Sequence, residues 1–98
     1  MSQVVPFHDP ENYRSVMIRI KQLWEKGNVI ITFHARERMA ERSIDILDIQ
    51  HIIKYGRVVG HIIEKRRWKY ELTNKLTDGR KASCVVVLEA RAIIITVY

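Results

Sequence analysis

The chain has a single cysteine, Cys84, so no disulfide bond can form within it. This usage is typical of a reducing compartment, and the cytoplasm is the expected location. No stretch approaches the roughly 20 apolar residues that cross a bilayer. Residues 1–7 also lack the charged and apolar regions of a secretory signal. We therefore expect no membrane partner.

Several motifs of enzyme chemistry are missing as well. The chain has no Gly-rich phosphate loop, no nucleophile elbow and no convincing pair of carboxylates. His8, His51, His61 and Cys84 show none of the paired spacings that metal ligands adopt. We expect no metal and no cofactor, and a metal-dependent nuclease is disfavoured.

Acidic residues are scarce in the second half of the chain. Residues 1–50 carry seven basic and seven acidic side chains, whereas residues 51–98 carry ten basic and four acidic ones. The net charge of +6 therefore comes from the C-terminal half. Such an asymmetry favours one basic face, whose commonest partner is a phosphate backbone, although a well-solvated basic surface would give the same composition.

The order of periodic segments predicts an α+β fold. A helix over residues 10–26, with an N-cap at Asp9 and a stop at Gly27, buries an apolar stripe that starts at Tyr13. The further expected elements are a strand over Asn28–Phe33, a helix over His34–Arg42, a helix from the Asp45 cap to about Tyr55, and strands over Arg57–Glu64, Trp68–Thr73, Arg80–Glu89 and Ala92–Tyr98. We expect one domain over residues 1–98, with N-terminal helices on one face of a mainly antiparallel five-stranded sheet.

The most specific local feature is the predicted helix that begins at His34. His34, Arg38 and Arg42 are four residues apart and form one polar stripe, beside an apolar stripe of Ala35 and Met39. The arginines could hold a phosphate, and His34 could move a proton near neutral pH. The alternative is structural, in which the arginines pair with nearby carboxylates or bind carbonyls at helix ends.

A second feature combines basic and aromatic residues. Lys65, Arg66 and Arg67 precede Trp68 and Tyr70, which share one strand face. Basic residues with stacking rings suit RNA, but the rings could equally belong to the core and the basic run to a solvated loop.

A third group of candidates lies around the later turns. Arg80 and Lys81 follow the Asp78-Gly79 hairpin signal, Arg91 precedes the last strand, and Tyr98 ends it. Lys69, on the opposite strand face from the rings of the second feature, is a further candidate phosphate contact.

Residues 26–44 resemble the opening of a family of small bacterial proteins catalogued as a domain of unknown function. The run reads KGNVIITFHARERMAERSI, and the family's mark is a strand followed by His-Ala-x-x-Arg-Met-x-x-Arg-Gly-Ile. The later segments TDGR at 77–80 and IIITVY at 93–98 also match, so the resemblance spans about residues 20–98. Ser43 departs from the pattern, because the family usually has glycine there.

That family looks related to the RelE/ParE-like toxins of type II toxin–antitoxin pairs, including the MqsR group. The resemblance implies a small sheet flanked by helices, and an endoribonuclease (mRNA interferase) activity that is either free or ribosome-dependent. It also implies a cognate antitoxin, often a zinc-finger and helix-turn-helix protein similar to MqsA.

Our leading hypothesis is a metal-independent endoribonuclease that uses the 2′-hydroxyl of RNA as nucleophile. His34 or Tyr98 would transfer the proton, and Arg38 and Arg80 would stabilise charge on the phosphate. The RNA strand would be held by basic side chains: Arg42, Lys65, Arg66, Arg67, Lys69, Lys81 and Arg91. The alternatives are a non-catalytic toxin of the same fold that binds a target protein, and a basic nucleic-acid-binding module.

Overall fold

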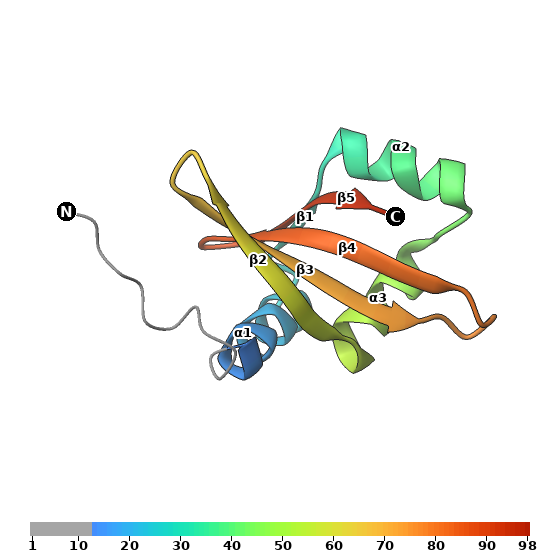
Figure 1. The fold of residues 1–98 in the computed structure, drawn as a ribbon, viewed down its shortest axis with the longest axis horizontal. Coiled ribbons are helices and arrows are strands. Elements are labelled where there is room, and N and C mark those ends of the chain that lie inside the picture. The colour runs from blue at the N-terminus through green and yellow to red at the C-terminus, as the bar shows by residue number, and fades with distance from the viewer. Residues whose placement is uncertain (1–12) are drawn as a thin grey trace.

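The computed structural model describes residues 13–98, whose helices and strands are shown in Figure 1. Helix α1 (Tyr13–Glu25) buries Val16, Met17, Ile20 and Leu23, four members of the predicted apolar stripe. It is followed by Gly27 at a φ of +77°, a conformation that glycine adopts without a steric cost. The predicted cap at Asp9 and the start of the helix at residue 10 lie outside the described residues.

Strand β1 (Val29–Ile31) is shorter than predicted, because the chain turns into helix α2 (Phe33–Arg42) earlier than its β-branched run suggests. The hydroxyl of Thr32 accepts a hydrogen bond from the backbone N–H of Ala35 at 3.1 Å. Thr32 is thus the N-cap of α2 rather than a strand residue, and Phe33 belongs to the helix.

Helix α3 (Ile46–Tyr55) begins as the sequence predicts. Asp45 and Asp48 each accept a hydrogen bond from the backbone N–H of the other, at 2.9 and 3.0 Å, which forms a capping box. Gly56 follows the helix, and its N–H donates to the carbonyl of Ile52 at 2.7 Å.

The remaining strands are β2 (Arg57–Glu64), β3 (Arg67–Lys75), β4 (Lys81–Leu88) and β5 (Ala92–Val97). The sheet has the order β1-β5-β4-β3-β2, with β1 parallel to β5 and every other pair antiparallel. The predicted α+β fold with a mainly antiparallel five-stranded sheet is therefore confirmed. Strand β3 is longer than predicted, while β4 and β5 end close to the expected residues.

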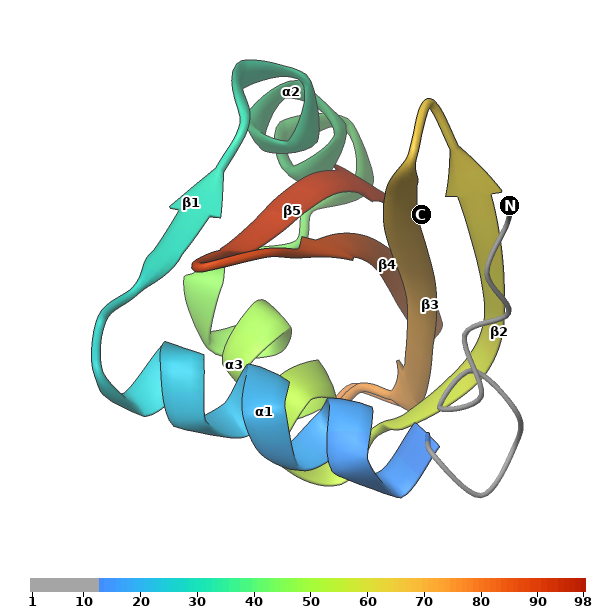
Figure 2. The same cartoon turned by 90° about the vertical axis from the view of Figure 1, so that its left-hand side faces the viewer.

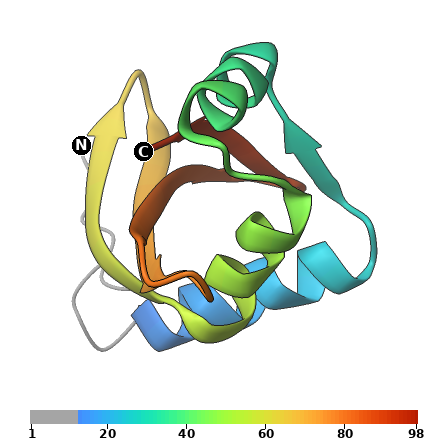
Figure 3. The same cartoon turned by 90° about the vertical axis from the view of Figure 1, so that its right-hand side faces the viewer.

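The sheet is curved, and the helices lie on both sides of it. Helices α1 and α3 lie within the curve, whereas α2 lies against β5 on the side away from them (Figures 2 and 3). Within the curve, α1 and α3 share one core cluster with the sheet, which includes Leu72, Cys84 and Val97. Cys84 is fully buried in this core, with an exposed fraction of 0%.

We call the face opposite α1 and α3 the outer face of the sheet. Among residues 13–98, no helix is long and apolar enough to span a membrane.

Candidate functional site

A row of polar residues crosses the outer face near one end of the sheet. In the register of the sheet, Arg57 of β2 lies opposite Thr73 of β3, and Thr73 lies opposite Ser83 of β4. Ser83 exchanges two backbone hydrogen bonds with Tyr98, at 2.6 and 2.8 Å. Residues directly opposite in an antiparallel sheet point to the same face, so these four side chains share the outer face.

The middle of this row is buried and fully hydrogen-bonded. The hydroxyl of Thr73 donates to the carbonyl of Ala82 at 3.1 Å, and the hydroxyl of Ser83 donates to that of Thr73 at 3.0 Å. Buried hydroxyl groups need such partners, because an unpaired one costs about 1–3 kcal/mol. The row therefore has a fixed polar centre.

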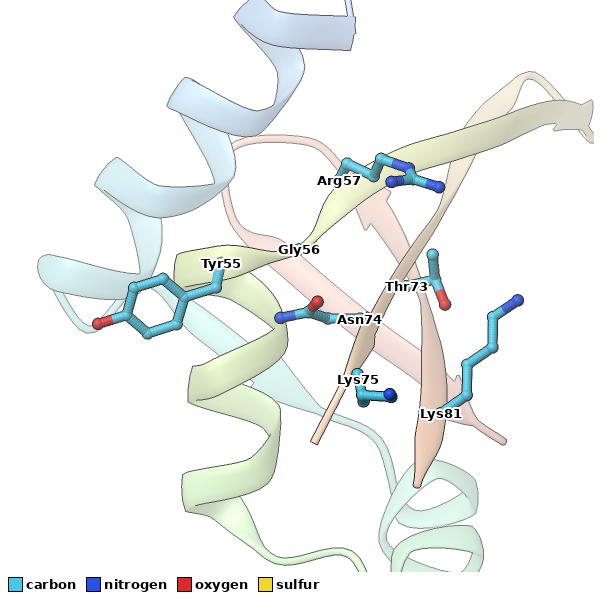
Figure 4. Close-up of a pocket in the computed structure, with 7 residues that line it drawn as sticks. All are labelled: Tyr55, Gly56, Arg57, Thr73, Asn74, Lys75 and Lys81. Atoms are coloured by element: carbon cyan, nitrogen blue, oxygen red, sulfur yellow. The ribbon is translucent and has the colours of Figure 1, made fainter. Parts of the chain in front are cut away.

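Beside this row lies a hollow of about 240 Å³, shown in Figure 4. Its lining comes from the end of α3, the start of β2, the end of β3 and the start of β4: Tyr55, Gly56, Arg57, Thr73, Asn74, Lys75 and Lys81. Three of these residues are cationic and none is acidic. In Figure 4 the side chains of Arg57, Lys75 and Lys81 lie around Thr73, whereas the Tyr55 ring points away from them.

Within residues 13–98, the three cations of the hollow form no ion pair. The ion pairs of residues 13–98 join Arg38 to Glu41, Arg67 to Glu89, Lys69 to Glu64, and Arg80 to Asp78, and none involves the hollow. Lys75 and Lys81 also lie directly opposite each other across the β3–β4 hairpin. Like charges in this position are destabilising. The hollow is thus a site of uncompensated positive charge.

Arg80, predicted to stabilise a phosphate, forms a structural bridge. Its guanidinium donates to the carbonyl oxygens of Arg42 and Ser43, at 2.6 and 3.0 Å, and to the carboxylate of Asp78 at 2.8 Å. These bonds tie the end of α2 to the start of β4. The guanidinium bears five N–H groups, so two remain for another ligand.

Tyr98, the other predicted group at this end, is hydrogen-bonded to the side chain of Glu71. Glu71 lies on β3 two residues before Thr73, so its side chain shares the outer face. The hydrogen bond with Glu71, with a smaller contribution from burial, raises the pKa of Tyr98 to about 12. Tyr98 therefore keeps its proton near neutral pH.

The side chains of the predicted polar stripe on α2 are only partly available to a ligand. His34 is exposed, and Arg38 forms a long contact of 3.5 Å with Glu41. The Nε of Arg38 is buried and has no hydrogen-bond partner among the described residues. Arg42 contributes its carbonyl to the bridge with Arg80.

The other predicted RNA contacts lie at the opposite end of the sheet. Lys65 and Arg66 form the β2–β3 turn, and Arg91 lies in the β4–β5 connection. Arg67 pairs with Glu89 at 3.0 Å, and Lys69 pairs with Glu64. Strand β3 runs from this end to the hollow, and eight rises of about 3.3 Å make the separation roughly 26 Å. The structure therefore divides the predicted basic face into two patches.

Arg57, Lys75, Thr73 and Glu71 were not among the predicted site residues. Lys75 could have been found, because the Asp78-Gly79 turn sets the hairpin register that places Lys75 opposite Lys81. Arg57 and Glu71 had no comparable local signal, since their position depends on how β2 pairs with β3.

The described residues include no group of three or more His, Cys, Asp or Glu side chains that could hold a metal ion. Comparison with curated proteins and with solved structures found no significant match. The profile of a protein family described as Domain of unknown function (DUF4258) matches residues 31–98. This match covers more than half of the chain and includes α2, α3 and strands β2 to β5, so the chain belongs to the DUF4258 family.

Proposed function

We propose that this protein is the toxin of a type II toxin–antitoxin pair and a metal-independent endoribonuclease that a cognate antitoxin neutralises in the cytoplasm. The observation that carries the proposal is the gathering of cations and a protonated tyrosine on one face at one end of the sheet. Arg57, Lys75 and Lys81 surround the hollow and form no ion pair with the described part of the chain, and Tyr98 ends the same polar row. The family that the α2 motif resembles looks related to RelE/ParE-like toxins, and that relation is in keeping with the same activity.

In the proposed reaction, the 2′-hydroxyl of RNA attacks the adjacent phosphate and the 5′-oxygen of the next nucleotide leaves. One group must remove the proton of the hydroxyl, and another must protonate the leaving oxygen. Tyr98 is proposed for the second role, because a tyrosine is protonated near neutral pH, although the hydrogen bond with Glu71 that raises its pKa to about 12 makes it a weaker acid. His34 is the proposed base, and it is exposed at the start of α2.

Negative charge builds up on the phosphate during this attack, and nearby guanidinium groups would stabilise it. Arg80 can contribute through its two remaining N–H groups while its other bonds hold α2 in place. Arg38 is proposed for the same role from α2. On either side of the cleaved bond, the RNA strand would contact Lys81 and Arg42 at the end of the sheet that carries the hollow. A more distant part of the RNA would be held by the second patch, which consists of Lys65, Arg66, Arg67, Lys69 and Arg91.

One observation favours a non-catalytic alternative. The guanidinium of Arg80 is already bound to three acceptors, and Arg38 contacts Glu41, so both arginines can be explained by structure alone. On that account, the α2 motif is structural, and the protein is either a toxin that binds a target protein or a nucleic-acid-binding module.

The deciding experiment maps new RNA 5′ ends after brief induction of the protein in bacteria. Wild type should create new ends at recurring sites, and Tyr98→Phe and His34→Ala should each abolish them. Tyr98→Phe removes only the hydroxyl that would donate the proton. Glu37→Ala is the matched control for His34, because Glu37 is an exposed residue of the same helix outside the proposed site.

Each result points to one of the three functions. Growth arrest with no new RNA ends would replace the endoribonuclease with the target-binding toxin. New ends that persist in both variants would keep the activity but remove Tyr98 and His34 from the mechanism. Neither arrest nor cleavage would leave the nucleic-acid-binding module.

A further inference from the structure

The proposed catalytic mechanism does not explain why three cations line the hollow. We infer that the hollow is a binding site for one phosphate group of a single RNA strand, held by Arg57, Lys75 and Lys81. The inference rests on the proposed function for the choice of RNA as ligand, whereas the anion-binding character of the hollow follows from its own residues.

The first argument is electrostatic. Lys75 and Lys81 face each other on adjacent strands, and Arg57 lines the same hollow, so three positive charges are held together. Among residues 13–98, no carboxylate lines the hollow, although Asp78 and Glu71 are within a few residues along the chain. Such an arrangement opposes folding through charge repulsion. A bound anion would remove that repulsion, and a phosphate matches both a guanidinium and an ammonium as partner.

The second argument concerns the shape of the hollow. Gly56 lies where the chain leaves α3, and a Cβ atom there would lie 2.4 Å from the carbonyl oxygen of Ile52 and 2.6 Å from that of Thr73. Glycine thus allows the α3–β2 junction to approach β3 closely enough to close one side of the hollow. Thr73 is fixed beneath the cations by its two hydrogen bonds. One side of the hollow is therefore set by the backbone, and Thr73 at its base is held by hydrogen bonds.

The third argument favours a strand over a free anion. The three cations are all exposed, so a chain can pass over them. The polar row leads from Arg57 across Thr73 and Ser83 to Tyr98 on the same face. Three strand spacings of about 4.8 Å separate its ends by roughly 14 Å. An RNA strand that lies across the sheet would place one phosphate in the hollow and a neighbouring part of the chain at Tyr98.

The test measures binding of a short 2′-O-methyl RNA of mixed sequence, which has no free 2′-hydroxyl and cannot be cleaved by the proposed reaction. Affinity is measured over a range of salt concentrations for wild type and for Arg57→Gln, Lys75→Gln and Lys81→Gln. The one phosphate contact in the hollow should contribute about 0.7 to the magnitude of the slope of log K against log salt, so each variant should lower the slope by up to that amount. Arg19→Gln is the control, because Arg19 is exposed on α1, on the other side of the sheet.

A competition experiment distinguishes the phosphate of an RNA strand from free inorganic phosphate. Inorganic phosphate should displace the RNA no better than chloride at equal ionic strength. Displacement by low millimolar phosphate would assign the hollow to a free phosphate and overturn the RNA assignment. The inference would also be overturned if wild type failed to bind the RNA, or if the three variants bound it like Arg19→Gln.

A measurement of stability distinguishes weaker RNA binding by a variant from a defect in its folding. Lys75→Gln and Lys81→Gln each remove one partner of the repelling pair, so each should raise the urea midpoint above that of wild type while weakening RNA binding. A lower midpoint would contradict the repulsion argument. Wild type that binds the 2′-O-methyl RNA through the hollow, yet leaves ordinary RNA uncut, would defeat the proposed nuclease and keep the phosphate site.

Discussion

Ser43 occupies a backbone conformation that suits glycine better than serine. It ends α2 with φ 54° and ψ 47°, in the left-handed region. Its N–H donates to the carbonyl of Ala40 at 3.3 Å, and the N–H of Ile44 donates to that of Met39 at 2.8 Å. This is a helix C-cap in which side chains with a Cβ are strained. Glycine would adopt this conformation without the strain, so this chain keeps the turn at some cost.

Ser43→Gly should therefore stabilise the protein, by about 0.5–1 kcal/mol, because it removes the strain of a side chain at positive φ. Urea denaturation measures the change in the free energy of unfolding. Ser15→Gly is the control, since Ser15 is exposed within α1 and glycine there should destabilise by a few tenths of a kcal/mol. A loss of stability in Ser43→Gly would mean that the serine makes a compensating interaction.

The junction between α3 and β2 depends on the absence of a side chain at Gly56. A Cβ atom at this position would meet two backbone carbonyl oxygens, which cannot move away as a flexible side chain could. Gly60 lies within β2 and has no atom within 4 Å of the corresponding position. The two glycines thus provide a matched pair for testing the junction.

Gly56→Ala should lower the free energy of unfolding by about 1–3 kcal/mol through overpacking. Gly60→Ala should be neutral or stabilising, because alanine loses less conformational entropy on folding than glycine. Denaturant titration of both variants measures the difference. Equal effects would show that the chain relaxes around Gly56, and that the wall of the hollow is not rigid.

Elements with strong local signals could be predicted from the sequence, and those set by distant pairing could not. The Asp45 cap and the Asp78-Gly79 turn fix α3 and the β3–β4 hairpin by chemistry within a few residues. The β2–β3 turn carries no such signal, because Lys65 and Arg66 both adopt positive φ, at 53° and 64°, without glycine or asparagine. The parallel pairing of β1 with β5 joins residues far apart in sequence and follows no local pattern.

The same difference between local signals and distant pairing explains which residues of the site could be predicted. Lys81 was predicted from its place after the hairpin turn, but Arg57 enters the hollow only because β2 pairs with β3 at the edge of the sheet. Arginine is a residue type that binds phosphate, and Arg80 was predicted to do so. Its hydrogen bonds to the carbonyls of Arg42 and Ser43 arise from the packing of α2 against the sheet. Spacing along the chain cannot reveal such a contact.

At the scale of the whole molecule, the excess of positive charge is divided between the two ends of the sheet. One patch surrounds the hollow, and the other includes Lys65, Arg66 and Arg91 at the far turns (Figure 1). In the far patch Arg67 and Lys69 are paired with carboxylates, whereas the cations of the hollow are not. A charge count by half of the chain therefore predicts the basic character but not which patch is free to bind.

The core that unites the helices and the sheet contains a chemical reporter of global unfolding. Cys84 lies in the middle of β4 with an exposed fraction of 0%. Burial, with a smaller contribution from Glu71, raises the pKa of its thiol to about 12. Since the thiolate is the reactive form, a thiol reagent at pH 8 should modify the native protein only after the core opens.

We therefore expect native Cys84 to react with a disulfide reagent many times more slowly than the urea-unfolded chain does, and the rate to follow the unfolded fraction across the urea transition. The raised pKa also predicts a pH dependence. The protonated thiol is compatible with the core below the ordinary thiol pKa of 9, and stability should fall as pH rises from there toward 12. Cys84→Ala, which keeps an apolar side chain, should remove the thiol's part of this alkaline loss. Fast labelling of the native protein at pH 8 would show that β4 opens without global unfolding, and the sheet would then not be one cooperative unit.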